Sequence, residues 1–170
     1  RGDKIRKTVI LDTSGILMFF EFSVDWEKEL LRLLDGYCIV VPTEVIKELE
    51  LLSKQTASER KRKAAAAWKL AERYHTVETN AENADDAVIE AAKKTHGVVV
   101  TNDTVLRKRL NHDSIPVIFL RGKKKLAYAV KKRNRGHYVL MEFAGAAGLV
   151  AELERNMRLD ERVLKFITVK

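Results

Sequence analysis

The feature that most constrains the fold of this chain is an alternation of short apolar runs with longer helical patterns over its first two-thirds. Runs of strand length occupy residues 8–11, 37–41, 74–77, 97–101 and 115–120. Helical patterns begin near Val24, at Pro42–Thr43, at Ser58 and after Asn83. Parallel strands need a long crossover, usually a helix, so this alternation is typical of a parallel sheet. We therefore predict an α/β fold in which helices wrap a parallel sheet.

The pattern changes after Leu120. A strand-like run, a basic turn, a second strand-like run, a helical segment and a last strand-like run follow, at residues 123–130, 131–136, 137–143, 147–158 and 163–169. A short turn joins antiparallel strands, so the first two runs predict a β-hairpin. The whole tail is then a ββαβ segment.

The change of pattern divides the chain into two parts. We predict a first domain over residues 1–121 and a C-terminal segment over residues 122–170. No flexible linker marks the boundary. We therefore expect the segment to share a strand or a core with the first part, or with a second copy of the chain in a homodimer.

Two aspartates directly follow predicted strands. Asp12 ends the run Val9-Ile10-Leu11, and Asp103 follows the run that ends in Thr101 and Asn102. Ligands of open α/β sheets bind beyond the carboxyl ends of the strands, so these acids are candidates for a site. Capping of the next helix is the alternative for either one alone.

Glu48 is a third candidate acid. It lies three residues after Val45 and four before Leu52 on a predicted helix, which places it on the inward-facing stripe. An inward carboxylate is costly unless it is paired or binds a cation. We therefore predict a functional role for Glu48.

Asp85 and Asp86 open the helix that Asn83 is expected to cap. Acids in a first helical turn are favoured by the helix dipole without any catalytic role. Helical phase aligns Asp85 with Val88 and Ala92, and Asp86 with Ile89 and Glu90. Periodicity alone leaves the choice between the two aspartates open.

Carboxylates are the hard oxygen ligands that Mg²⁺ and Mn²⁺ prefer, and no histidine or cysteine set with ligand spacing competes with them. The chain has 32 Lys and Arg against 24 Asp and Glu, a formal net charge of +8. Such a charge attracts anionic partners such as nucleic acid. A carboxylate cage on a basic protein suits metal-dependent hydrolysis of phosphodiester bonds without a covalent enzyme intermediate.

Four acidic segments together resemble the motifs of PIN domains, in order and in the elements between them. They are Val9-Ile10-Leu11-Asp12-Thr13-Ser14, the segment from Val41 to Leu49 that contains Glu48, Ala84-Asp85-Asp86-Ala87-Val88-Ile89, and Val100-Thr101-Asn102-Asp103. The run from Ile115 to Arg121 resembles the closing strand of archaeal members related to ribosomal-RNA-processing nucleases. The likeness covers about residues 5–125.

The resemblance implies a Rossmann-like PIN fold and an endoribonuclease that acts on single-stranded or ribosomal RNA with Mg²⁺ or Mn²⁺. All five acids would be catalytic, and we assign Asp12, Glu48, Asp86 and Asp103 as metal ligands, with the choice between Asp85 and Asp86 open. Thr13, Ser14, Thr101 and Asn102 would support the ligands through hydrogen bonds. Ordinary turn chemistry is the alternative for these four residues.

Residues 122–170 resemble the second half of bacterial small-subunit ribosomal protein number six. The likeness runs from Gly122-Lys123-Lys124-Lys125-Leu126 through Val163-Leu164-Lys165-Phe166. The first strand and first helix of that ferredoxin-like domain are missing, and half a domain leaves a sheet edge and a helix face uncovered. We interpret the joining of two such families at Gly122 as an engineered or recombined chimera.

The tail also carries a basic cluster that predicts contact with RNA. Its members are Lys123, Lys124, Lys125, Lys131, Lys132, Arg133 and Arg135. A solvated hairpin turn explains the same charges equally well.

The chain shows no signal peptide and no apolar run of membrane-spanning length, which predicts a cytoplasmic protein without a membrane partner. Two alternatives to a nuclease remain. One is a non-catalytic RNA-binding or ribosome-associated protein whose acids are caps and surface charges. The other is a chimera with no selected function.

Overall fold

The computed structural model describes residues 6–22, 25–34, 36–55, 58–130, 133–142 and 147–160. In these residues six strands form one sheet, in the order β3-β2-β1-β4-β5-β6. The strands are β1 (Lys7–Leu11), β2 (Tyr37–Pro42), β3 (His75–Val77), β4 (Val98–Val100), β5 (Val117–Val130) and β6 (Arg133–Glu142). The first five pair in parallel and β6 pairs with β5 antiparallel. The predicted α/β fold with a parallel sheet is thus confirmed.

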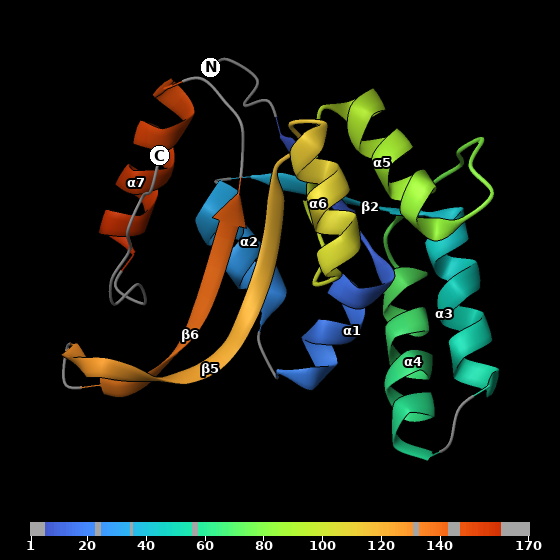
Figure 1. The fold of residues 1–170 in the computed structure, drawn as a ribbon, viewed down its shortest axis with the longest axis horizontal. Coiled ribbons are helices and arrows are strands. Elements are labelled where there is room, and N and C mark those ends of the chain that lie inside the picture. The colour runs from blue at the N-terminus through green and yellow to red at the C-terminus, as the bar shows by residue number, and fades with distance from the viewer. Residues whose placement is uncertain are drawn as a thin grey trace.

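Helices connect the parallel strands and cover the sheet (Figure 1). They are α1 (Thr13–Glu21), α2 (Trp26–Leu34), α3 (Thr43–Gln55), α4 (Ser58–Ala71), α5 (Ala84–Thr95), α6 (Thr104–His112) and α7 (Ala147–Leu159). Helices α3 and α4 pack against each other, and α1 packs on α4. None of the helices in the described ranges is long and apolar enough to cross a membrane.

The core centres on β1, which has a neighbouring strand on each side. Val9, Ile10 and Leu11 have no exposed surface. On β4, Val99 and Val100 are fully buried and Val98 is almost so. A strand covered on both faces can be apolar throughout, which explains these continuous runs. Because β1 and β4 run side by side in parallel, their carboxyl ends meet at one edge of the sheet.

The segment after β1 differs from the prediction. The sequence pattern predicts one helix from about Val24, whereas α1 begins at Thr13 and α2 at Trp26. Helix α1 is apolar on most sides, with Ile16 and Met18 buried, and therefore lacks the polar stripe that marks an amphipathic helix.

The C-terminal segment joins the sheet through β5, which runs from Val117 to Val130 without ending at the predicted boundary. The ladder with β6 shifts by one residue between Leu120 and Lys123, which is the position of a β-bulge. The predicted turn at 131–136 is too long, because β6 already begins at Arg133. The predicted last strand at 163–169 lies outside the described residues.

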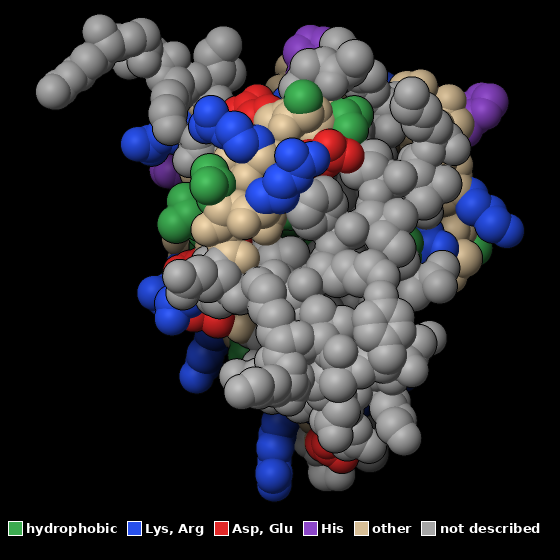
Figure 2. Space-filling view, turned by 90° about the vertical axis from the view of Figure 1, so that its left-hand side faces the viewer, with side chains coloured by type: hydrophobic (Ala, Val, Ile, Leu, Met, Phe, Trp, Pro, Cys, Tyr) green, Lys and Arg blue, Asp and Glu red, His purple; other side chains and the backbone are tan. Residues whose placement is uncertain are grey.

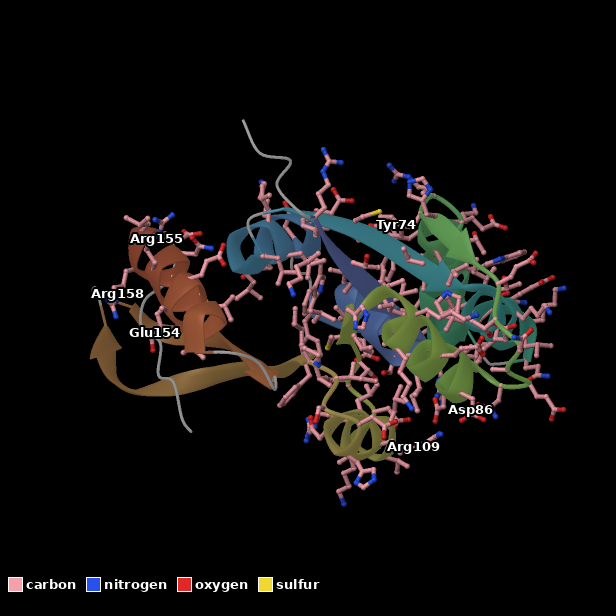
Figure 3. The ribbon with its side chains drawn as sticks, turned by 90° about the horizontal axis from the view of Figure 1, so that it is seen from above. Tyr74, Asp86, Arg109, Glu154, Arg155 and Arg158 are labelled. Atoms are coloured by element: carbon pink, nitrogen blue, oxygen red, sulfur yellow. The ribbon has the colours of Figure 1, made fainter. Side chains whose placement is uncertain are left out.

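Helix α7 packs against α2 and buries Leu153, which is 5% exposed. It lies at the opposite end of the long axis from α3, α4 and α5 (Figures 1 and 3). Seen from that side, the described surface carries acidic, basic and apolar side chains close to one another (Figure 2). Because β6 pairs with β5 and α7 packs on α2, both elements find partners within the same chain.

Candidate active site

Asp12 lies at the carboxyl end of β1, where the chain turns into α1. Its side chain is 3% exposed and does not cap the helix. Instead Oδ2 accepts hydrogen bonds from the hydroxyls of Ser14 at 2.8 Å and Thr101 at 2.7 Å. The capping alternative is therefore wrong for Asp12, and a carboxylate buried among hydroxyl donors remains.

Gly15 allows this arrangement, because the first turn of α1 lies directly against the end of β4. A Cβ atom at Gly15 would collide with the carbonyl oxygen of Val100. The backbone N–H of Asp12 donates to that same carbonyl at 3.1 Å. The close approach brings Ser14 within 3.0 Å of the Thr101 hydroxyl.

Asp103 begins α6 just beyond β4. Its Oδ1 caps the helix by accepting from the backbone N–H groups of Val105 and Leu106 at 2.8 and 3.0 Å. Its own N–H donates to Thr101 Oγ1 at 3.1 Å. Thr101 therefore connects Asp103 to Asp12. Asp103 both caps α6 and belongs to the group of acids around Asp12.

The four predicted supporting residues lie around these acids. Ser14 and Thr101 bond Asp12, Thr13 Oγ1 donates to Glu48 Oε2 at 2.9 Å, and the N–H of Asn102 donates to Ser14 Oγ at 3.0 Å. A sequence signal for this network was present, because each residue lies within three positions of a strand end.

Glu48 reaches the group from α3, but the predicted burial is wrong. The buried side of α3 is formed by Val45, Leu49 and Ser53, and Glu48 is exposed on its flank. A helix turns by about 100° per residue, so Glu48 lies next to the buried stripe without belonging to it. Its bond to Thr13 still directs the carboxylate toward the end of β1.

Asp85 and Asp86 have different surroundings. Asp86 Oδ1 accepts from Arg109 of α6 at 2.6 Å, and Oδ2 accepts from Asn83 Nδ2 at 2.8 Å (Figure 3). The negative charges of Asp12 and Asp103 act instead on Asp85. Asp86 is thus paired with a cation, and its assignment as a metal ligand stays a prediction, with Asp85 as the open alternative.

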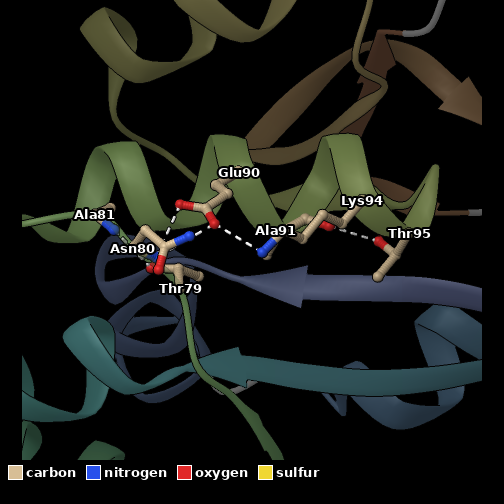
Figure 4. A network of polar contacts seen from close by, with 7 residues as sticks. All are labelled: Thr79, Asn80, Ala81, Glu90, Ala91, Lys94 and Thr95. Atoms are coloured by element: carbon tan, nitrogen blue, oxygen red, sulfur yellow. Dashed lines mark hydrogen bonds and ion pairs between the residues drawn. The ribbon is translucent and has the colours of Figure 1, made fainter.

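A network of polar contacts fixes the loop that leads into α5 (Figure 4). The backbone N–H of Asn80 donates to both carboxylate oxygens of Glu90 at 3.1 and 3.2 Å, and Lys94 pairs with the same glutamate at 2.8 Å. Asn83 then caps the helix by accepting from the N–H of Asp86 at 2.9 Å. With the start of α5 fixed, Asp85 has a defined position.

Burial and neighbouring negative charges raise the pKa of two of these acids, Asp12 and Asp85. Desolvation raises the pKa of Asp12 above its ordinary value, while the hydroxyls of Thr101 and Ser14 oppose the shift. Desolvation, then the charges of Asp12 and Asp103, raise the pKa of Asp85. The pKa of Asp86 is lowered by its bond to Arg109. The charge of Arg109 opposes the shift at Asp85. Asp12, Glu48, Asp85 and Asp103 are hereafter called the acidic cluster.

The carboxylate oxygens of the acidic cluster are the type of ligand that a hard divalent cation binds. The hydrogen bonds to the side chains of Asp12 and Asp103 come from hydroxyls and backbone amides, which leave both charges uncompensated. The carboxylates do not meet at one point, because among the described residues no three acids, histidines or cysteines lie close enough together to hold a metal ion. The fit therefore rests on the chemistry of the donors.

Arg109 is a charged neighbour of the site that sequence reasoning missed. It lies in the last turn of α6, where a basic residue is expected for the helix dipole alone. Its partner is on another helix, and no local pattern predicts that pairing.

Of the predicted RNA-binding residues in the tail, Lys123–Lys125 lie on β5, Arg133 and Arg135 lie on β6, and Lys131 and Lys132 fall outside the described residues.

Residues 9–123 match a family model described as a PIN-like domain. The solved structure of the PIN domain endonuclease Utp24 is similar, with a TM-score of 0.54 and 26% identity over 66% of this chain and 84% of that one. A domain of a functionally unknown protein from Methanocaldococcus jannaschii has a TM-score of 0.53 and 17% identity, over 73% of this chain and 98% of that one. The second likeness concerns the fold alone.

The last 49 or so residues have different relatives. They are similar to the small ribosomal subunit protein bS6 of Syntrophobacter fumaroxidans, with 86% identity over 49 residues, or 29% of this chain and 33% of that protein. The bS6 protein of Desulfatibacillum aliphaticivorans is 57% identical over 49 residues, or 29% of this chain and 26% of its own length. The chain spans a third or less of these ribosomal relatives.

Proposed function

The chain belongs to the PIN-like domain family, and on that premise we propose that it is a divalent-metal-dependent endoribonuclease acting on single-stranded or ribosomal RNA. The observation that carries the proposal is the acidic cluster at the neighbouring carboxyl ends of β1 and β4, where the buried carboxylate of Asp12 is hydrogen bonded by neutral hydroxyl and backbone donors. A buried carboxylate without a cationic partner is costly, and structural need does not explain it.

In this proposal the acids bind the metal ion and their neighbours hold them in position. Asp12, Asp85, Asp103 and Glu48 would hold Mg²⁺ or Mn²⁺, and Ser14 and Thr101 would keep the Asp12 carboxylate oriented. When bound, such an ion lowers the pKa of water and stabilises the charge that develops on the phosphate and the leaving oxygen. Asp86 has a different part, since it ties the start of α5 to Arg109 on α6.

Metal-dependent thermal stability tests this assignment directly. A ligand that binds only the folded state raises the melting temperature in proportion to its binding, so we expect Mn²⁺ to stabilise the parent chain. Asp12→Asn and Asp85→Asn should abolish most of that gain. Asp86→Asn is the matched control, one residue from Asp85, and should retain it. Loss of the gain in Asp86→Asn alone would restore the original assignment of that residue.

Ribosome association is a second candidate function, which the ribosomal relatives of the tail favour. In this case the basic residues of the hairpin would contact RNA and the acids would be inert. Co-sedimentation with small ribosomal subunits, compared between the parent and Lys123→Gln/Lys124→Gln/Lys125→Gln, distinguishes it. A chimera with no selected function would show neither metal-dependent stability nor co-sedimentation.

A homodimer through the tail and a cytoplasmic location remain predictions. Pairing of two copies is not needed to cover the described parts of the tail, because β6 lies on β5 and α7 on α2 of the same chain. We therefore propose a nuclease that does not depend on a second copy.

A further inference from the structure

The first turns of α4 carry a run of basic residues that the acidic cluster does not use. Arg60, Lys61 and Arg62 are all exposed, and no partner is found for any of them among the residues that the structure describes. Three other helix lysines are paired: Lys54, Lys63 and Lys94 each bind a glutamate four residues earlier. One turn after Arg60, Lys61 and Arg62 the sequence has Ala64, Ala65 and Ala66 instead.

Stability does not explain the position of these charges. The amino-terminal end of a helix carries a partial positive charge, so cations there are unfavourable and anions favourable. Three cations beside one another also repel. A run that weakens its own helix and lacks partners within the described fold fits an anionic partner outside it.

The run lies at one end of a path that starts at the acidic cluster. Helices α3 and α4 lie side by side, and the end of the pair that carries the start of α4 extends past the sheet (Figure 1). Glu48, Leu51 and Gln55 share one stripe of α3, since they are three and four residues apart, and all three are exposed. The stripe therefore leads from Glu48 to the end of α3 near the basic run.

Leu51 gives this path a second, independent feature. It is 55% exposed and therefore offers an apolar surface to a ligand on the outer side of α3. It is placed between the acidic cluster and the basic run. An exposed apolar side chain on α3, followed by exposed cations at the start of α4, suits a nucleobase on the leucine and phosphates near the cations.

We infer that the stripe Glu48–Leu51–Gln55 and the basic run Arg60–Arg62 form the path of a single-stranded RNA as it leaves the acidic cluster. From Glu48 to Gln55 the helix rises about 10 Å, which corresponds to about three nucleotides of a stacked strand. The phosphates about three nucleotides from the cleaved bond then meet the basic run. This inference deepens the proposed function and rests on it for the direction of the path.

The test is binding of a fluorescently labelled 12-nucleotide oligouridine in the presence of chelator, which removes any cleavage. The triple variant Arg60→Gln/Lys61→Gln/Arg62→Gln should bind at least about tenfold more weakly at about 0.1 M salt. The slope of log affinity against log salt should fall by about 2, because each lost single-strand phosphate contact removes about 0.7. Its melting temperature should stay equal or rise, since glutamine is a good helix former and the unfavourable charges are gone.

The matched control removes the same charge elsewhere. Arg6, Lys69 and Arg73 are exposed; Lys69 lies in the last turn of α4 and Arg73 lies two residues beyond its end. Their triple glutamine variant should weaken binding less than about threefold with an unchanged salt slope. For the apolar contact, Leu51→Ser should weaken binding several-fold at constant slope, and Leu31→Ser, which changes a leucine with 57% exposure on α2, should leave it unchanged.

Equal losses in the two charge triples, with equal slopes, would overturn the inference and leave only a general attraction between a basic protein and RNA. If the triple variant unfolds, the single changes Lys61→Gln and Lys69→Gln carry the same comparison. Failure of the proposed nuclease is visible separately. In that case the parent does not cleave RNA with metal, although binding in chelator still depends on the basic run.

Discussion

The PIN-like part and the C-terminal segment of this chain are held in the fold in different ways. In the first part, β1 is flanked by β2 and β4 and its apolar residues Val9, Ile10 and Leu11 are fully buried. In the second, β6 has one described partner strand, and α7 packs on one helix, α2. Every acid of the cluster comes from the first part. The candidate site is therefore built without a residue of the C-terminal segment.

Truncation after Arg121 should have the largest effect and tests how far the two parts depend on each other. It removes the partner of Val117–Leu120 and uncovers α2, so we expect loss of a large share of the roughly 5–15 kcal/mol typical of a domain, together with lower solubility. Urea unfolding followed by circular dichroism measures it. An unchanged midpoint in the shortened chain would show that the segment is dispensable.

Two cavity substitutions sharpen the same comparison. Ile10→Ala, in the centre of the sheet, should cost about 4 kcal/mol, and Leu153→Ala, on α7, about 2 kcal/mol. If the chain unfolds as one unit, both changes shift a single transition. A separate early transition in Leu153→Ala would instead mean that the tail unfolds on its own.

Asp12→Asn should stabilise the chain without metal. Because burial raises the pKa of Asp12, the folded chain holds this proton more tightly than the unfolded chain, whose value is near 3.8. As the pH rises above 3.8 the parent loses the stability that the protonated acid provides, and the variant does not. We expect a gain in stability at pH 7 that disappears as the pH falls below 3.8. Unfolding curves in chelator at both pH values measure it, and a loss at pH 7 would contradict the account.

Asp85→Asn and Asp86→Asn should have small effects of opposite sign. The raised pKa of Asp85 predicts a small gain in stability at neutral pH, and the lowered pKa of Asp86 predicts a small loss. The loss should fade as the pH falls through the pKa of Asp86, because its bond to Arg109 then weakens in the parent as well. Melting temperatures in chelator compare the two variants. Equal shifts would show that the aspartates share one environment.

The sequence was sufficient for the sheet and for the acids that follow its strands, because burial on both faces and the strand-end position leave local signals. It was insufficient where neighbours decide. Asp85 and Asp86 differ by one helical step, and the position of Arg109 on another helix gives them different surroundings. Glu48 was expected to be buried, but its spacing from Val45 does not show which of two neighbouring stripes packs on the core. Helix α1 gave no amphipathic signal at all.

The central claim is that the acidic cluster makes this chain a metal-dependent ribonuclease. Its most direct test is cleavage of labelled single-stranded RNA with Mn²⁺, Mg²⁺ or chelator by the parent, by Asp12→Asn/Asp103→Asn and by Asp86→Asn. We predict metal-dependent cleavage by the parent, a loss of about 100-fold or more in the double variant, and retention of most activity in Asp86→Asn. Cleavage at the same rate by the parent and the double variant, or none by the parent with either metal, would contradict the claim.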